Sequence, residues 1–158
     1  PRMREYGAAA VAILVDDEGG ISLDPARRLA IAERILEAGA RYGLGPTDFL
    51  FDAVVLGAAT EPRGARVTFE TMRLLRERLG CNITLGASNA AFGLPARPLF
   101  NAHFLSVAVV LGCNAPITDL TVPGLKHALL VAEVLRGVDE YGCAYLDALR
   151  PKPVAEIA

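Results

Sequence analysis

A loop of small residues over 85–95 holds Ser88 and Asn89, two side chains that could bond in the plane of a flat ligand. Small neighbours let a ligand approach the backbone closely, and a carboxamide donates and accepts hydrogen bonds at once. The loop has no His, Lys, Arg or Cys, so it offers neither a strong base nor a covalent nucleophile. We expect it to act by positioning and hydrogen bonding. The alternative is an ordinary turn in which Ser88 and Asn89 satisfy their own backbone.

A carboxylate, Asp52, interrupts the apolar run over 49–56. Burying a carboxylate without donors is costly, so Asp52 needs a partner. A heterocycle edge that presents a ring N–H beside an amino group would match the carboxylate with two parallel hydrogen bonds, as arginine does. The alternative is that Asp52 accepts from backbone amides or from an arginine outside this chain.

Other polar residues give weaker signals. Asp16, Asp17 and Glu18 either hold a hard cation such as magnesium or simply face solvent, and acids after a strand more often face solvent. His103 and His127 have no nucleophile or metal partner at a recognisable spacing, which indicates structural or surface roles. The glycines do not form a phosphate loop of the dinucleotide or Walker type. We therefore expect no metal in the site.

Repeated strand–helix units must position these residues. Apolar runs typical of buried parallel strands cover 8–15, 49–56, 83–87 and 115–118. Helices are expected over 25–42, 68–79, 98–111, 123–136 and 139–149, after the end of a helix at 2–6. Asp24 before Pro25 predicts one N-cap, and Thr68 predicts another. The helix over 98–111 is apolar nearly all round, so it is either sandwiched in the interior or carries a subunit contact.

The order strand–helix, four times over, requires parallel strands and right-handed crossovers. Four such units are half of a (β/α)8 barrel, a fold that typically takes about 250 residues. We expect an α/β fold in which residues 1–149 form the C-terminal half of such a barrel and residues 150–158 form a tail. The missing half would come from a longer parent chain, a partner subunit or a second copy, and a homodimer is the expected assembly. The alternative is an open four-stranded α/β sheet.

The composition excludes several classes of function. The 158 residues are 53% hydrophobic, enough to build a core, and 16 basic and 18 acidic residues are interspersed to a net charge of −2. We therefore expect no nucleic-acid partner. No apolar run approaches the roughly 20 residues of a membrane-spanning helix, so we expect no membrane association. The three cysteines, Cys81, Cys113 and Cys143, lack metal-ligand spacing, which indicates a reducing, cytoplasmic setting.

The motif Ser-Asn-x-x-Phe-Gly-Leu-Pro over 88–95, followed by Asn101 and by 104–105, resembles the pterin-binding barrel of methyltetrahydrofolate:corrinoid methyltransferases. That family includes the folate domain of cobalamin-dependent methionine synthase. Weaker matches over 27–37, 51–52, 68–75 and 125–128 extend the resemblance over most of the chain. The family usually carries a proline where Ala53 stands, and its first four strands have no counterpart here.

This resemblance implies that the barrel binds N5-methyltetrahydrofolate in its mouth and delivers the methyl group to cob(I)alamin on a corrinoid protein or domain. Asp52 would accept hydrogen bonds from N3–H and the 2-amino group of the pterin, and Asn89 would reach N5. Ser88 and Asp16 complete the expected substrate-binding set. An amide that follows the charge developing at N5 assists methyl departure without being the acid itself, and the nucleophile belongs to the cofactor.

Two alternative functions stay open from the sequence. Dihydropteroate synthases share the barrel but carry a cationic cluster near the seventh strand, whereas residues 88–91 here have no charge, which favours methyl transfer. A non-catalytic half-barrel that binds folate or a partner is the other alternative. It is motivated by the missing strands and by the apolar helix over 98–111.

Overall fold

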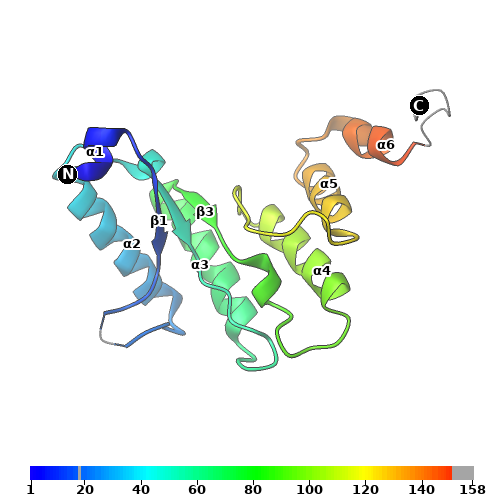
Figure 1. Ribbon diagram of the computed structural model, residues 1–158, viewed down its shortest axis with the longest axis horizontal. Helices are drawn as coiled ribbons and strands as arrows, with labels where there is room; N and C mark the ends of the chain where they lie inside the picture. Colours follow the sequence, from blue (N-terminus) through cyan, green and yellow to red (C-terminus); the bar gives the residue numbers. More distant parts are fainter. Residues whose placement is uncertain (18, 151–158) are drawn as a thin grey trace.

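The centre of the computed structural model, which describes residues 1–17 and 19–150, is a small parallel sheet (Figure 1). Its strands are β1 (Ala10–Ile13), β2 (Phe49–Asp52) and β3 (Asn82–Thr84), in that order across the sheet. The register pairs Ile13 with Asp52 and Asp52 with Thr84. The carboxyl ends of the three strands are therefore level, which confirms the predicted α/β fold with parallel strands.

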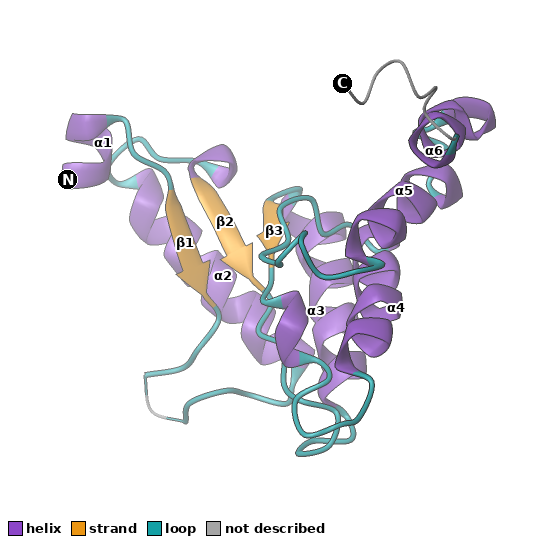
Figure 2. Ribbon diagram, turned by 45° about the vertical axis from the view of Figure 1, so that its right-hand side comes forward, coloured by secondary structure: helices purple, strands orange, loops and turns teal. Residues whose placement is uncertain are grey.

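Helices follow the strands as the hydrophobic spacing predicts. They are α1 (Arg2–Tyr6), α2 (Pro25–Ala40), α3 (Gly64–Leu79), α4 (Arg97–Val110), α5 (Leu125–Leu135) and α6 (Cys143–Leu149). Single turns of 3-10 helix lie at η1 (Pro46–Asp48), η2 (Ala87–Asn89) and η3 (Glu140–Gly142). Helices α2 and α3 lie side by side along one face of the sheet (Figure 2). Asp24 caps α2 as predicted, because its Oδ1 accepts from the amide of Ala26 at 2.9 Å.

Helix α3 begins at Gly64 and not at Thr68, so the predicted cap at Thr68 is wrong. Thr68 lies one turn inside the helix and is fully buried. Gly64 starts the helix where the chain passes close to the preceding loop: a Cβ on Gly64 would lie 2.9 Å from that of Leu56. Helix α2 ends at Ala40, two residues before the predicted end at 42, and Tyr42 is about half exposed.

The fourth predicted strand, over 115–118, is reduced to a single parallel bridge between Gly86 and Ile117. Residues 114–117 still follow β3, since the amide of Ile117 donates to the carbonyl of Leu85 at 2.9 Å. However, the amides of Asn114 and Ala115 both donate to one carbonyl, and Pro116 has no N–H. A regular ladder cannot form there, and the described residues show an open sheet of three strands, not a closed barrel.

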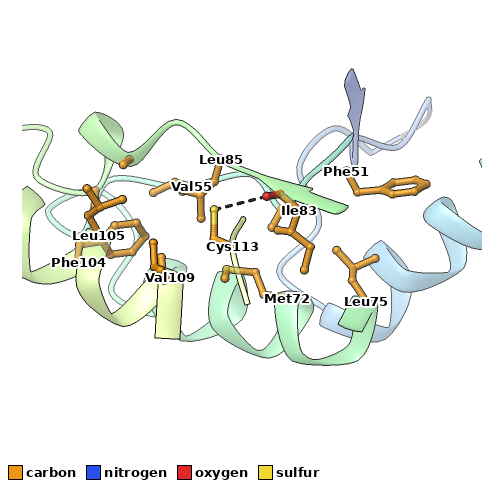
Figure 3. Packing of buried hydrophobic residues seen from close by; sticks show 14 of the residues in the cluster. Phe51, Val55, Met72, Leu75, Ile83, Leu85, Phe104, Leu105, Val109 and Cys113 are labelled. Atoms are coloured by element: carbon orange, nitrogen blue, oxygen red, sulfur yellow. Dashed lines mark hydrogen bonds between the residues drawn. The ribbon is translucent and has the colours of Figure 1, made fainter. Parts of the chain in front are cut away.

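The core fills the space between the sheet and the helices (Figure 3). Phe51, Met72, Leu75 and Ile83 are fully buried in it. Burial also raises the pKa of the Cys113 thiol to about 11. On the opposite face of the sheet the packing is incomplete, since Val11 and Ile13 are exposed there, and we call it the open face.

Helix α4 resolves the question that its apolar sequence raised. Phe104 and Leu105 are buried against the core and α5, whereas Leu99 and Val107 are exposed. The helix is thus packed on one side and not sandwiched. Within residues 1–17 and 19–150, no helix is long and apolar enough to cross a membrane. The tail predicted over 150–158 lies, apart from Arg150, outside the described residues.

Candidate functional site

Asp52 is the last residue of β2 and lies on the open face of the sheet. Its neighbour Phe51 points into the core, and alternation along the strand sends Asp52 the other way, half-buried. Its Oδ1 accepts from the amide of Val54 at 2.8 Å. Among the described residues nothing donates to Oδ2. The alternative of backbone amides as partners is thus confirmed for one oxygen, and the other stays available to a ligand.

Asn89 is the last residue of the η2 turn, at the end of β3. Its side chain is exposed and folds back over Gly86, where an added Cβ would lie 2.9 Å from Nδ2. The backbone of the turn forms its own hydrogen bonds. The amide N–H of Asn89 donates to the carbonyl of Gly86, and the carbonyl of Asn89 accepts from the amide of Phe92, each at 3.1 Å. In the part of the chain that the structure describes, the carboxamide itself makes no hydrogen bond. The turn alternative therefore accounts for the backbone but leaves the side chain unused.

Helix α4 holds the loop that carries Ser88. The carbonyl of Ser88 accepts from Nη2 of Arg97 at 3.1 Å and from Nδ2 of Asn101 at 3.5 Å. Asn101 is buried, and its Oδ1 accepts from the amide of Ala91 at 3.2 Å. The hydroxyl of Ser88 makes no hydrogen bond to any described residue. Asn101, which the sequence motif includes, thus acts as a brace for the loop.

The loop after β2 and the η2 turn touch each other. The amide of Ala58 donates to the carbonyl of Ala90 at 3.0 Å, and a Cβ on Gly57 would lie 3.2 Å from that of Phe92. Asp52, at the end of β2, and Asn89, in the turn that follows the neighbouring strand β3, therefore lie at the same end of the sheet, as the sequence predicts for residues that follow parallel strands.

The backbone leaves β2 through an unusual turn. Ala53, where the resemblance leads one to expect proline, uses its N–H to bond the carbonyl of Thr84 at 3.2 Å. Val54 then adopts a φ of 55°, which is rare for a β-branched residue. Its carbonyl accepts from Nη1 of Arg28 at 3.0 Å and from Oγ1 of Thr68 at 2.9 Å.

Arg28, on α2, is fully buried, and its role was not predicted from the sequence. Its Nε donates to the carbonyl of Ser22 at 2.7 Å and its Nη1 to that of Ala53 at 2.6 Å, while Nη2 is buried without a partner among residues 1–17 and 19–150. Burial lowers the pKa of the guanidinium, and the charge of Asp52 opposes that shift. The sequence signal that could have identified Arg28 as buried was its helical spacing, because Arg28 shares a helix face with the buried Ala32.

The loop after β1 is held by ion pairs. Asp16 pairs with Arg27, and Asp17 lies 3.7 Å from Arg34, while Glu18 lies outside the described residues. Over residues 1–17 and 19–150, no group of three or more His, Cys, Asp and Glu side chains is placed to hold a metal ion. Asp16 as a substrate ligand stays a prediction.

No protein-family model matches the chain. The methylcorrinoid:tetrahydrofolate methyltransferase of Eubacterium limosum is 25% identical over 144 residues, which are 89% of this chain and 52% of that protein. The methionine synthase of Mycobacterium tuberculosis is 32% identical over 121 residues, 72% of this chain and 10% of the enzyme. That of Mycobacterium leprae is 28% identical over 151 residues, 90% of this chain and 12% of the enzyme.

The chain thus spans about half the length of the first relative and about a tenth of the other two. These similarities agree with the resemblance that the Ser-Asn motif and the Asp52 strand gave in the sequence. The chain is similar in sequence to pterin-binding methyltransferases.

Proposed function

We propose that the chain supplies the C-terminal half of a (β/α)8 barrel that transfers a methyl group between N5-methyltetrahydrofolate and a corrinoid held by a partner protein or domain. One observation carries the proposal. Asp52 and Asn89 lie at neighbouring strand ends, and each keeps hydrogen-bonding atoms that no described residue uses. The name of the Eubacterium limosum relative, a methylcorrinoid:tetrahydrofolate methyltransferase, supports the choice of ligand.

Asp52 would bind the pterin through its carboxylate. Val54 occupies one lone pair of Oδ1, which leaves the rest of Oδ1 and all of Oδ2 as acceptors. The N3–H and the 2-amino group of a pterin are two parallel donors, which suit a carboxylate in the bidentate geometry. This contact fixes the orientation of the ring.

Asn89 would act at N5. A methyl group leaves N5 readily only when that nitrogen carries positive charge, so a hydrogen bond that strengthens with this charge lowers the barrier. Gly86 has no side chain, and the amide of Asn89 can therefore lie close to the backbone and keep both of its polar atoms exposed. Because the carboxamide both donates and accepts, it can follow the change of charge at N5 in either direction of transfer.

The corrinoid, when its carrier is bound, supplies the cobalt that exchanges the methyl group. The residues of this chain would align the pterin so that the N5 methyl group faces that cobalt. The name of the Eubacterium limosum relative is written with the methylcorrinoid first, and our assignment of Asp52 and Asn89 holds for both directions.

The rest of the barrel would cover the open face. Val11 and Ile13 are exposed there although β1 lies beside β2, and the outer edge of β1 has no strand beside it in the described residues. We propose that further strands, from the same polypeptide or from a second copy, pair with this edge. Ser88 and Asp16 would then border the completed mouth.

The test is methyl transfer by the intact protein, with N5-methyltetrahydrofolate and cob(I)alamin followed by absorbance. We expect Asn89→Ala to lower kcat by about 10²- to 10³-fold, because it removes a group that acts in the transition state. Asp52→Asn should mainly weaken binding, by about tenfold or more, since one acceptor becomes a donor that faces the pterin amino group.

Asp147→Asn is the matched control, because Asp147 is an exposed carboxylate on α6 whose recorded partner is Arg150. It should keep wild-type rates. Methyl transfer that is absent in the wild type, or equal in wild type and Asn89→Ala, would contradict the proposal.

A further inference from the structure

The turn after β2 is held more firmly than the packing of the sheet requires. Val54 has a φ of 55°, a conformation in which a β-branched side chain is strained. Such a residue persists only where its surroundings determine its conformation, and strained residues concentrate at functional sites.

Every polar backbone atom of Val54 is engaged. Its amide donates to Oδ1 of Asp52 at 2.8 Å. Its carbonyl accepts two hydrogen bonds, from Nη1 of Arg28 at 3.0 Å and from Oγ1 of Thr68 at 2.9 Å. Arg28 comes from α2 and Thr68 from α3, so the two helices that cover the sheet fix one peptide from the opposite side.

Burying the charge of Arg28 to fix a loop costs free energy. Its guanidinium is fully buried, and Nη2 has no partner among the described residues. Well-packed apolar side chains at such places are often as stabilising as buried charges. The hydrogen bonds that Arg28 donates connect two loops. One bond goes to the carbonyl of Ser22, in the loop after β1, and the others go to the carbonyls of Ala53 and Val54, in the loop after β2.

We propose that Arg28 and Thr68 are positioning residues that fix the Val54 peptide, so that the amide of Val54 holds one oxygen of Asp52 and leaves the other for the substrate. The inference rests on the proposed function, because the substrate of Asp52 is there taken to be the donor edge of a pterin. Neither residue touches the substrate, and both act through Val54 on the carboxylate.

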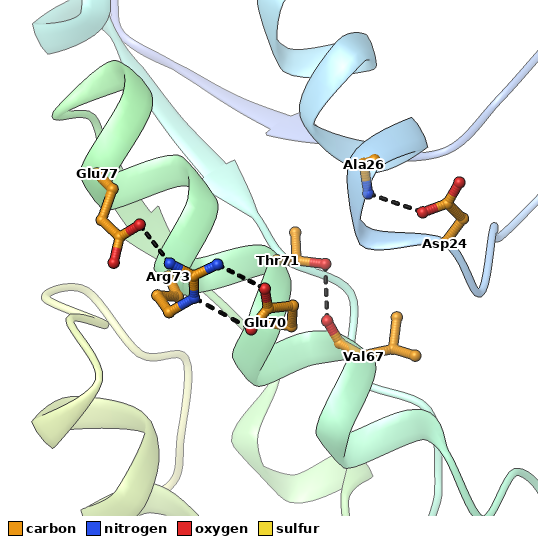
Figure 4. Close-up of polar contacts among 7 residues, drawn as sticks. All are labelled: Asp24, Ala26, Val67, Glu70, Thr71, Arg73 and Glu77. Carbon is orange, nitrogen blue, oxygen red and sulfur yellow. Dashed lines mark hydrogen bonds and ion pairs between the residues drawn. The ribbon is translucent and has the colours of Figure 1, made fainter.

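Helix α3 contains a matched pair for the test. Thr68 and Thr71 are both fully buried, and each donates to the carbonyl one turn earlier in the helix. Thr68 donates to Gly64 at 3.0 Å. Thr71 donates to Val67 at 2.7 Å (Figure 4). Only Thr68 also reaches the carbonyl of Val54, so its single hydroxyl proton is shared between the carbonyls of Gly64 and Val54. Changing each threonine to the isosteric valine removes the helix-internal bond in both cases, but the bond to the turn in one case only.

In the intact protein, Thr68→Val should weaken the binding of N5-methyltetrahydrofolate by about fivefold, which corresponds to one lost hydrogen bond. Thr71→Val should leave the affinity within about twofold of wild type. In an Asp52→Asn background, Thr68→Val should have no further effect on affinity, since residues that act through one another are not additive. Arg28→Lys, which keeps the charge but loses the fork, should weaken binding in the same direction as Thr68→Val.

The ligand-free protein gives a second readout. The hydrogen exchange of the Val54 amide should accelerate by about fivefold or more in Thr68→Val and stay unchanged in Thr71→Val. Equal effects of the two valine variants on exchange and affinity, or independent effects of Thr68→Val and Asp52→Asn, would contradict the positioning role. A wild type that binds no N5-methyltetrahydrofolate would instead contradict the proposed function.

Discussion

The two faces of the sheet differ in how completely they are covered. On the helix side, Phe51 and Ile83 are 0% exposed, whereas on the open face Val11 and Ile13 are 54% and 56% exposed. The register places Phe51 beside Ala12 and Asp52 beside Ile13, so adjacent residues of one strand meet these two different environments. The helix side is a completely buried core, whereas the apolar side chains of the open face are not covered by the described residues.

The difference separates stability from function. On the helix side the local preferences of the chain agree: apolar spacing, caps and packing lead to one structure. At the edge of the open face they do not, since Val54 is strained, Nη2 of Arg28 is buried without a described partner, and the side-chain carboxamide of Asn89 bonds no described residue. Proteins break such rules mainly at functional sites, which supports our placement of the site at this edge.

The largest effect is expected where the helix side is most tightly packed. Phe51→Ala should lower the free energy of unfolding by about 3–5 kcal/mol, because it removes a large side chain from a core that cannot collapse around the space. Urea denaturation of the intact protein measures it. Leu135→Ala, at a side chain that is 67% exposed, is the control and should change stability by less than about 1 kcal/mol. Similar losses in both would mean that the helix side is not a completely buried core.

The second test addresses the open face. If further protein covers it, Ile13→Asp buries a charge and should destabilise the intact protein by at least about 2 kcal/mol. Leu135→Asp, at an exposed position on α5, should stay within about 0.5 kcal/mol of wild type. Equal stability of the two variants in urea denaturation would show that the open face is also open in the intact protein.

Much of the helix side could be predicted from the sequence, because its signals are local. Periodic apolar residues and the Asp24 cap placed α2 within two residues of its observed ends. The strands were predicted too long, since the apolar run over 49–56 continues past β2 into the turn at Val54. The fourth strand failed for a similar reason: the run over 115–118 is apolar, but Pro116 breaks the ladder.

The site could be predicted only in part. Asp52 and Asn89 were predicted from their residue types and their places after strands, where parallel sheets gather polar groups, and their roles stay predictions. The contacts of Arg28 and Thr68 with Val54 were not predicted because the partners are far apart in the sequence. Val54 lies 26 positions after Arg28 and 14 positions before Thr68. No local pattern indicates such a contact, and a threonine before an apolar run looks like a helix cap.

A smaller effect is expected at the start of α2, the helix that carries Arg28. Asp24→Ala removes the oxygen that accepts from the amide of Ala26 and should cost about 1 kcal/mol of unfolding free energy. Thermal unfolding with a known enthalpy measures it. Asp17→Ala, in the preceding loop, is an appropriate control because Asp17 is 91% exposed and lies 3.7 Å from its ion-pair partner. An equal loss in the two variants would mean that the cap does not stabilise α2.

The smallest effect is expected on the solvent side of α3, where Arg73 bonds Glu70 and Glu77 (Figure 4). The hydrogen bond from Arg73 lowers the pKa of Glu70 below its ordinary value of 4.5. A lowered pKa means that the pair stabilises the fold above pH 4.5 and that this stabilisation is lost as the pH falls through the folded-state pKa. Arg73→Gln should therefore reduce the melting temperature slightly at pH 7, and this difference from the wild type should shrink as the pH falls below 4.5.

Salt should weaken the difference at pH 7 in the same way, because exposed ion pairs are screened. Glu5→Gln, on α1, is the control, since it changes an acidic side chain away from this cluster. An acid-induced loss of stability that is large and equally present in Arg73→Gln would have to come from carboxylates elsewhere.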